Sequence, residues 1–137
     1  MAFLLDTNVA IHLRDGDDAV LEKIEALEEA ILISIVTRVE LEGGVYREPA
    51  HAAVRRARLD AMLAAIPALA FDDTAAEIYG AIVADAGYSR RKLLDRMIAA
   101  QAIAHRATLI TFDADDFADV KGLSLLVWRG PSPSETT

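Results

Sequence analysis

With 137 residues, 53% of them hydrophobic, the chain is long enough for one domain with an apolar core, and its composition excludes a disordered protein. The absence of cysteine excludes disulfide bonds and thiolate metal ligands, and a formal net charge of −8 argues against a nucleic-acid coat protein, which is expected to be basic. No apolar run reaches the roughly 20 residues that span a bilayer and no secretion signal is recognisable, so we expect a cytoplasmic protein.

Apolar runs of strand length alternate with helical patterns along the whole chain. The apolar runs, which read as buried strands, are residues 1–5, 31–34, 68–71, 107–111 and 123–128. Helical spacing or helix-start residues mark residues 9–13, 20–29, 36–46, 49–66, 73–87 and 93–104. This alternation predicts an α/β fold, a three-layer α/β/α sandwich around a central, mostly parallel sheet. We expect a single domain over residues 1–128 and a flexible tail over residues 129–137.

Acidic residues follow two of the expected strands directly. Asp6 comes after the first strand and Asp113 after the fourth. Because the carboxyl ends of parallel strands meet at one edge of a sheet, these two side chains should lie close together. Glu40 and Asp95 stand near the beginnings of helices that can pack over the same edge. A single aspartate after a strand is often only a helix cap, so the functional reading depends on the acids acting as a group.

Four or five converging carboxylates would repel one another unless a cation lies between them. Oxygen ligands suit Mg²⁺ or Mn²⁺ rather than Zn²⁺. Such an ion can activate water and stabilise charge on phosphoryl oxygens, which predicts hydrolysis of a phosphodiester. The residues expected around the ion are the ligands Asp6, Asp95 and Asp113, with Thr7, Asn8 and Thr111 orienting ligands or waters.

Four short motifs, in this order, resemble those of the PIN-domain nucleases. They are Leu-Leu-Asp-Thr-Asn at residues 4–8, Ser-x-x-Thr-x-x-Glu-Leu at 34–41, Asp-x-x-Ile-Ala-Ala at 95–100, and Thr-x-Asp-x-x-Asp-Phe at 111–117. Within that family the chain is similar to the VapC toxins of bacterial toxin–antitoxin pairs, and the resemblance covers residues 2–128. It implies an α/β/α fold and Mg²⁺- or Mn²⁺-dependent cleavage of RNA, often tRNA or ribosomal RNA.

The same resemblance assigns roles to the acids and implies partners. Asp6, Glu40, Asp95 and Asp113 match the acidic quartet of the family, and Asp116 matches a further acid that often assists. Some relatives carry Asn at the Asp113 position, so an aspartate makes this site more anionic. The expected partners are an RNA substrate, a second copy of the chain in a homodimer, and a VapB-like antitoxin that inhibits the enzyme from an apolar groove. No membrane partner is expected.

Basic residues crowd the sequence just before and after Asp95. They are Arg90, Arg91, Lys92 and Arg96. The functional interpretation is contact with RNA phosphates, and the alternative is an ordinary solubilising surface.

Two other functions remain open. One is a PIN module that binds RNA or a protein without cutting, which loss of core acids would indicate, and none is lost here. The other is a phosphoacceptor receiver domain, which needs a lysine at the end of a late strand. The only nearby candidate is Lys121, in an expected loop, so this reading ranks last.

Overall fold

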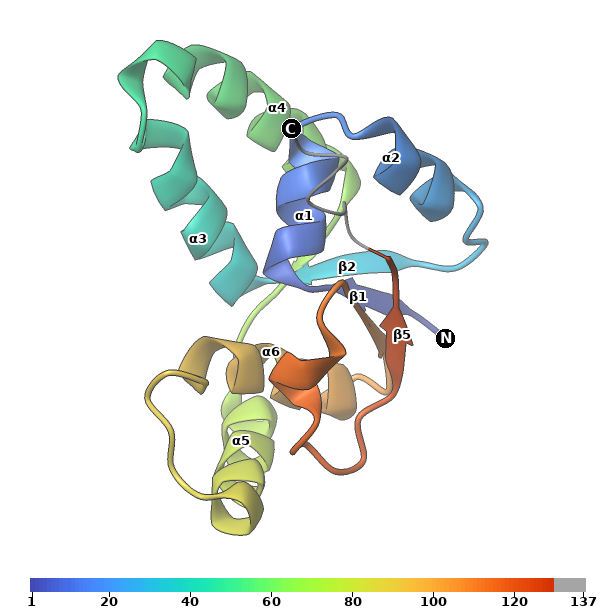
Figure 1. Ribbon diagram of the computed structural model, residues 1–137, viewed down its shortest axis with the longest axis vertical. Coiled ribbons are helices and arrows are strands. Elements are labelled where there is room, and N and C mark those ends of the chain that lie inside the picture. The colour runs from blue at the N-terminus through green and yellow to red at the C-terminus, as the bar shows by residue number, and fades with distance from the viewer. Residues whose placement is uncertain (130–137) are drawn as a thin grey trace.

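The computed structural model describes residues 1–129, and its centre is one five-stranded sheet (Figure 1). The strands are all parallel and lie in the order β3-β2-β1-β4-β5, which confirms the predicted α/β class. Their bounds are Phe3–Leu5 (β1), Ile31–Ser34 (β2), Ala68–Leu69 (β3), Thr108–Thr111 (β4) and Leu125–Val127 (β5). The tail predicted over residues 129–137 lies outside the described residues, except for Arg129.

Helices fill the connections between strands, close to where the sequence predicts them. They are α1 (Thr7–Arg14), α2 (Asp18–Glu25), α3 (Ile35–Tyr46), α4 (Ala52–Ala65), α5 (Asp73–Ala86) and α6 (Leu93–Ala104), with 3₁₀ turns η1 (Pro49–His51) and η2 (Ala114–Phe117). Within the described residues, none of the helices is both long and apolar enough to cross a membrane.

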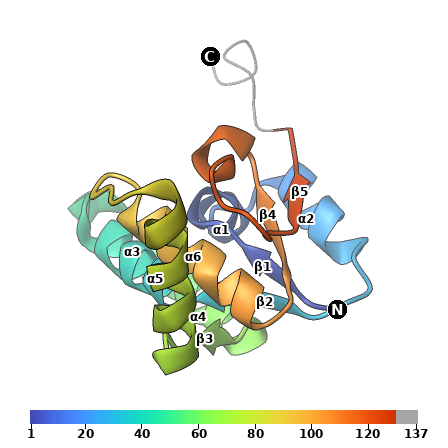
Figure 2. The same ribbon diagram turned by 90° about the horizontal axis from the view of Figure 1, so that it is seen from below.

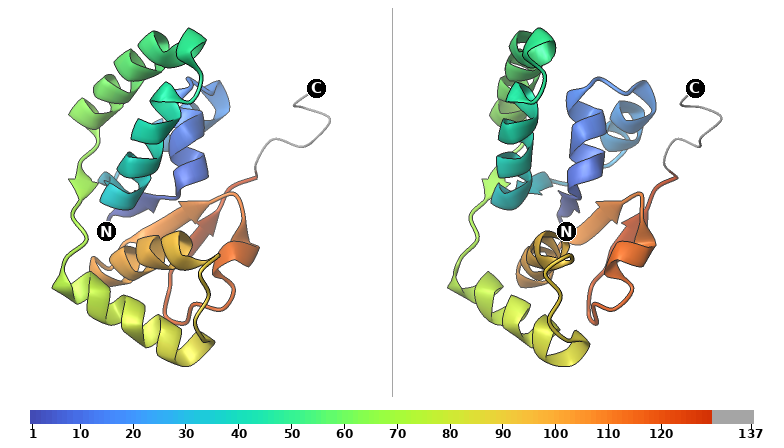
Figure 3. Two further views of the ribbon diagram at one scale, coloured as in Figure 1. Left: turned by 90° about the vertical axis from the view of Figure 1, so that its left-hand side faces the viewer. Right: turned by 60° about the vertical axis from the view of Figure 1, so that its left-hand side comes forward.

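The sheet buries a separate apolar core on each face, as the three-layer prediction requires. Successive strand residues point to opposite faces, so Leu5 packs with α1, α2 and α4, whereas Leu4 packs with α5 and α6. Helix α3 contributes to both cores. Figure 3 shows α5 and α6 on the opposite side of the sheet from α1, and Figure 2 shows these two helices packed side by side.

The order of the strands reverses beside β1. From β1 the chain builds outward through β2 to β3, and it then returns to place β4 on the other side of β1. In open parallel sheets, ligands bind outside the carboxyl ends of the strands at such a switch point. Asp6 follows β1 and Thr111 ends β4, so both residues lie at this position.

Gln101 ties helix α6 to the ends of two strands on the other side of the switch point. Its side chain is fully buried, and its Nε2 donates to the backbone oxygens of Leu69 (3.0 Å) and Ala70 (3.1 Å). Ser34, the N-cap of α3, donates its hydroxyl to Gln101 Oε1. Strand β3 has two residues rather than the four predicted from the apolar run, because its partner β2 ends at Ser34, opposite Leu69.

Replacing Gln101 with leucine should destabilise the protein, because two backbone oxygens and one hydroxyl lose their partner in a buried place. We expect the free energy of unfolding to fall by roughly 2–4 kcal/mol, measured by urea denaturation. Glu77→Leu on the exposed side of α5 is the control and should change it by no more than about 0.5 kcal/mol. Equal effects of the two substitutions would show that the Gln101 hydrogen bonds contribute nothing.

Candidate active site

Asp6 is fixed by both strands at the switch point. It is the N-cap of α1 and accepts a hydrogen bond from Thr7 N (2.9 Å), while Thr111 at the end of β4 donates its hydroxyl to the other carboxylate oxygen (2.8 Å). The side chain is only 4% exposed. Burial raises the pKa of Asp6, and the hydrogen bonds from Thr111 and Thr7 partly oppose that rise. The carboxylate is therefore held in one orientation at an energetic cost.

Glu40 is held by a chain of hydroxyl groups. Thr7 Oγ1 donates to Glu40 Oε1 (2.9 Å), and the Thr37 hydroxyl lies 2.9 Å from the same Thr7 oxygen. Since Thr7 gives its single hydroxyl proton to Glu40, Thr37 donates to Thr7. In the sequence Thr37 appeared only as part of the second motif, and this role was not predicted. The signal was the three-residue spacing of Ser34, Thr37 and Glu40, which places them along one side of a helix.

Asp95 lies in the first turn of α6 and is affected by all the other acids. Its pKa is raised to about 6, most of all by burial and then by the charges of Asp6, Asp116, Glu40 and Asp113, in that order. Such mutual repulsion requires that the carboxylates face one another across a short distance.

Asp116 and Asp113 belong to the segment after β4. Burial and the charge of Asp113 raise the pKa of Asp116, whereas the nearby Arg91 lowers it. Asp113 is exposed and caps η2, where it accepts a hydrogen bond from Asp115 N (3.1 Å). Asp113 thus lies at the margin of the group rather than in its centre.

A cavity of about 390 Å³, here called the carboxylate pocket, collects most of the residues singled out in the sequence. Four of the five acids line it, together with Thr7, Asn8, Arg90 and Arg91, and the apolar Ile11 and Leu94 complete its wall. Asp113 and Thr111 do not line it. Thr111 acts through Asp6 instead, by the hydrogen bond that it donates.

Two of the four basic residues do not face the carboxylate pocket. Arg96 is only 2% exposed and donates to Asp119 Oδ2 (2.8 Å) and to the backbone oxygen of Gly87 (2.6 Å). Lys92 Nζ binds the same Asp119 oxygen at 3.0 Å. The burial of Arg96 contradicts the expectation that this residue contacts RNA, because α6 turns its side chain away from the pocket and into the protein.

The donor chemistry of the carboxylate pocket fits a hard divalent cation. All of its acidic and hydroxyl donors are oxygens, which suit Mg²⁺ or Mn²⁺. Within residues 1–129, no three His, Cys, Asp or Glu side chains lie close enough together to bind one ion directly. Mg²⁺ commonly takes one or two carboxylates and keeps several waters, so Asp6 and Asp95, which both line the pocket, would be its ligands.

Comparison with solved structures identifies several proteins of similar fold. Solved structures similar to the chain include VapBC2 from Rickettsia felis bound to a promoter DNA fragment (TM-score 0.82, 26% identity, 93% of this chain and 99% of that one). Another is FitAcB from Neisseria gonorrhoeae (TM-score 0.78, 28% identity, 90% of this chain and 96% of that one). A third is VapBC-5 of the VapBC toxin–antitoxin family from Mycobacterium tuberculosis (TM-score 0.67, 32% identity, 94% of this chain and 98% of that one).

No curated protein matches the chain in sequence. The family model described as "PIN domain" matches residues 3–123, which is most of the chain and includes every acid of the carboxylate pocket. The chain therefore belongs to the PIN domain family.

Proposed function

We propose that the protein is a Mg²⁺- or Mn²⁺-dependent endoribonuclease that acts as the VapC-type toxin of a toxin–antitoxin pair. The observation that carries the proposal is the convergence of four carboxylates on one pocket at the switch point of the sheet. Membership of the PIN family and likeness to VapBC structures support it. A PIN module that binds without cutting is the weaker alternative, because the complete acidic set would then have no use.

The residues of the carboxylate pocket have different roles in the proposed cleavage of RNA. Asp6 and Asp95 would hold the metal, with Asp113 contributing from the margin. A bound divalent ion lowers the pKa of a water and stabilises charge on phosphoryl oxygens. Thr111 and Thr7 keep Asp6 and Glu40 in fixed orientations. These acids, together with Asp116, can accept hydrogen bonds from water at the scissile phosphate.

Arg90 and Arg91 supply the positive charge that RNA requires beside an acidic pocket. Both line the carboxylate pocket, and the charge of Arg91 acts on Asp116. Contacts to phosphate position a nucleic acid without selecting its sequence. A net charge of −8 is compatible with RNA binding because part of the negative charge lies where a cation would bind.

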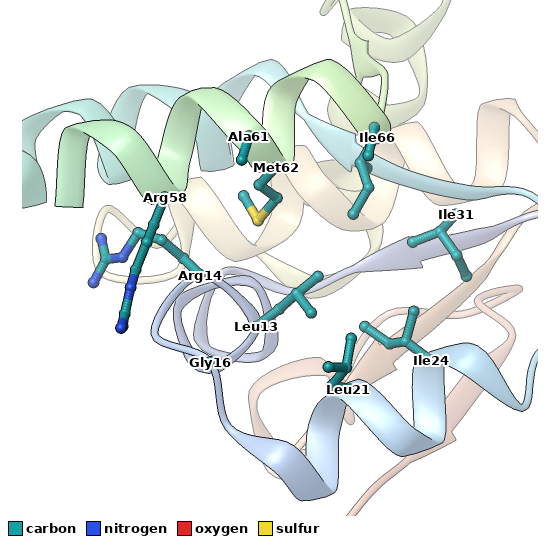
Figure 4. A pocket seen from close by; sticks show the side chains of 11 residues that line it. Leu13, Arg14, Gly16, Leu21, Ile24, Ile31, Arg58, Ala61, Met62 and Ile66 are labelled. Carbon is teal, nitrogen blue, oxygen red and sulfur yellow. The ribbon is translucent and has the colours of Figure 1, made fainter. Parts of the chain in front are cut away.

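An apolar groove of about 610 Å³ between α1, α2 and α4 suits the proposed VapB-like antitoxin (Figure 4). Its walls carry Leu13, Leu21, Ile24, Ile31, Met62 and Ile66, with Arg14 and Arg58 at one end. A groove of this kind accepts the apolar face of an amphipathic segment that folds on binding. The similar structure of VapBC-5, a member of the VapBC family of toxin–antitoxin systems, supports such a partner.

Shared lining residues link the apolar groove to the carboxylate pocket through an intermediate cavity. Arg14 lines both the groove and a second cavity of about 460 Å³, and that cavity shares Thr7, Ile11 and Glu40 with the carboxylate pocket. A segment leaving the groove past Arg14 could therefore place basic side chains among the acids and block the site.

We also propose a homodimer. Exposed apolar side chains on α3 and α4 support it, namely Val39, Tyr46 and Val54.

Asp6→Asn and Asp95→Asn should each reduce Mg²⁺-dependent RNA cleavage by about 100-fold or more, which is the usual effect of losing a group that stabilises transition-state charge. Cleavage of a labelled RNA with Mg²⁺ and with EDTA measures this. The control is Asp115→Asn, which removes an exposed acid between Asp113 and Asp116 and should cut at a rate near that of the wild type. Wild-type rates in a folded Asp6→Asn variant would exclude Asp6 from the site.

Asp95→Asn should stabilise the metal-free protein at neutral pH. The folded-state pKa of Asp95 is about 6, above the ordinary value of 3.8, so the folded protein binds the proton more tightly than the unfolded chain does. The stability of the protein therefore falls as pH rises from about 4 to 6. Asparagine cannot ionise, so the variant keeps the free energy of unfolding that the wild type loses, which we put at roughly 1–2 kcal/mol after discounting for solvent screening.

Urea denaturation in EDTA at pH 4 and pH 7 measures this effect. The gain from Asp95→Asn should be present at pH 7 and nearly absent at pH 4. A gain that is equal at both pH values would contradict repulsion as its source. Adding Mg²⁺ at pH 7 should raise the Tm of the wild type more than that of the variant, because the ion binds the charged carboxylate.

Leu21→Glu should separate inhibition from catalysis. Leu21 lines the apolar groove and is 39% exposed, so glutamate there should leave the fold intact but place a charge against the antitoxin. We expect the Kd for the protein encoded beside this chain to rise at least about tenfold, while RNA cleavage by the free chain stays unchanged.

Val127→Glu on β5 is the control, because Val127 is exposed but does not line the groove. It should bind the antitoxin as the wild type does. If the wild type forms no complex with the neighbouring protein, the toxin–antitoxin part of the proposal is wrong even if the nuclease part survives.

A further inference from the structure

Arg96 carries a buried charge immediately next to Asp95 in the sequence. It is 2% exposed and belongs to the largest fully buried side chains of the protein. A buried charge is costly unless it is paired and hydrogen-bonded, and such a pair often fixes one conformation rather than adding stability. Within residues 1–129, Arg96 Nε and Asp119 Oδ1 have no hydrogen-bond partner, so the pair is not even fully compensated. The Arg96–Asp119 pair is therefore expected to have a role other than stabilising the fold.

Arg96 and its partner Asp119 contact the two ends of one loop. Residues 87–92, here called the basic loop, connect α5 to α6. Arg96 Nη1 holds the first residue of the basic loop through Gly87 O, and Lys92, the last residue, binds Asp119 Oδ2 together with Arg96 Nη2. Gly87 ends α5 with a φ of +89°, a conformation that favours glycine. One carboxylate and one guanidinium therefore fix where the basic loop starts and where it ends.

Two arginines lie between these fixed ends and face the carboxylate pocket. They are Arg90 and Arg91. A further hydrogen bond inside the basic loop, from Lys92 N to Ser89 Oγ (3.3 Å), limits its shape. The other two cations, Lys92 and Arg96, bind Asp119 instead. Their hydrogen bonds lower the pKa of Asp119 to about 2, so this carboxylate stays charged at any physiological pH. The four cations of this region thus fall into two pairs, one facing the pocket and one facing Asp119.

We infer that Lys92, Arg96 and Asp119 form a positioning triad, which holds the basic loop so that Arg90 and Arg91 meet the phosphates of RNA bound at the carboxylate pocket. This inference rests on the proposed function. It changes the role of Lys92 from an RNA contact to a support for its two neighbours. A loop that is already ordered loses less conformational entropy when RNA binds, so the triad increases affinity without touching the ligand.

Asp119→Asn and Lys92→Met test the triad from its two sides. Asparagine keeps the size of Asp119 and a hydrogen-bond acceptor but removes the charge, and methionine removes the Lys92 charge from a position near the surface. The first readout is trypsin, which cuts after Arg90 and Arg91 only when the basic loop opens. We expect several-fold faster cutting at these two sites in both variants. Asp85→Asn is the matched control, since it removes the exposed ion pair with Lys121 (3.1 Å) without touching the basic loop.

The second readout is the binding of a fluorescent single-stranded RNA in EDTA over a range of salt concentrations. Both triad variants should bind RNA roughly tenfold more weakly, the lower end of the effect of removing a supporting partner. Their salt slope should equal that of the wild type, because the number of phosphate contacts is unchanged. Arg91→Ala should instead reduce the salt slope by the amount that corresponds to about one phosphate contact. This difference separates positioning residues from residues that touch phosphate.

Each outcome supports or overturns the inference. Wild-type trypsin cutting in Lys92→Met would overturn the triad as a support of the basic loop, and this variant decides the matter even if Asp119→Asn fails to fold. Faster cutting with unchanged RNA affinity would overturn the link to RNA. A reduced salt slope in Lys92→Met would make Lys92 a phosphate contact after all. If the wild type neither binds nor cuts RNA, the proposed function fails, while the trypsin result still decides whether the triad holds the loop.

Discussion

Repulsion between carboxylates at the carboxyl ends of β1 and β4 is the constraint on which the rest of the structure depends. The sheet brings Asp6, Glu40, Asp95 and Asp116 to one pocket, and burial together with this crowding raises the pKa of Asp95 to about 6. Apolar side chains of the same volume would pack there at lower cost. The energetic cost of this group therefore points to a functional role, and the proposed binding of a divalent cation is a role that suits oxygen donors.

The acids are oriented by neutral groups rather than by cations. Thr111 holds Asp6, and Thr37 and Thr7 hold Glu40, all through hydroxyl protons. A hydroxyl donor fixes a carboxylate without cancelling its charge, so the negative potential of the pocket remains available to an incoming ion. Arg96 lies one residue from Asp95 but is neutralised by Asp119 instead. The same separation of charges preserves the pocket and supports the proposed RNA contacts.

The sequence was sufficient to predict the class of fold and the gathering of most of the acids at one edge of the sheet, because both depend on local signals. Apolar runs followed at once by Asp6 or Asp113 mark strand ends, and the ends of parallel strands must meet. It was not sufficient for Arg96, which was grouped with its basic neighbours. Its burial depends on Asp119, 23 residues further along the chain, and each helical residue turns its side chain by about 100° from the one before it. Long-range partners of this kind leave no periodic pattern.

The pairing of β1 with β4 also determines when the site can exist during synthesis. Leu4 pairs with Leu109, so the central strand, made first, waits for nearly the whole chain before its second edge is covered. A growing chain carries Asp6 and Glu40 long before Asp95 and Asp116 have been added. A nascent or prematurely ended chain therefore has no assembled pocket and exposes the open edge of β1, where unpaired backbone groups invite aggregation. Such a fragment is expected to need protection by chaperones or removal by proteases.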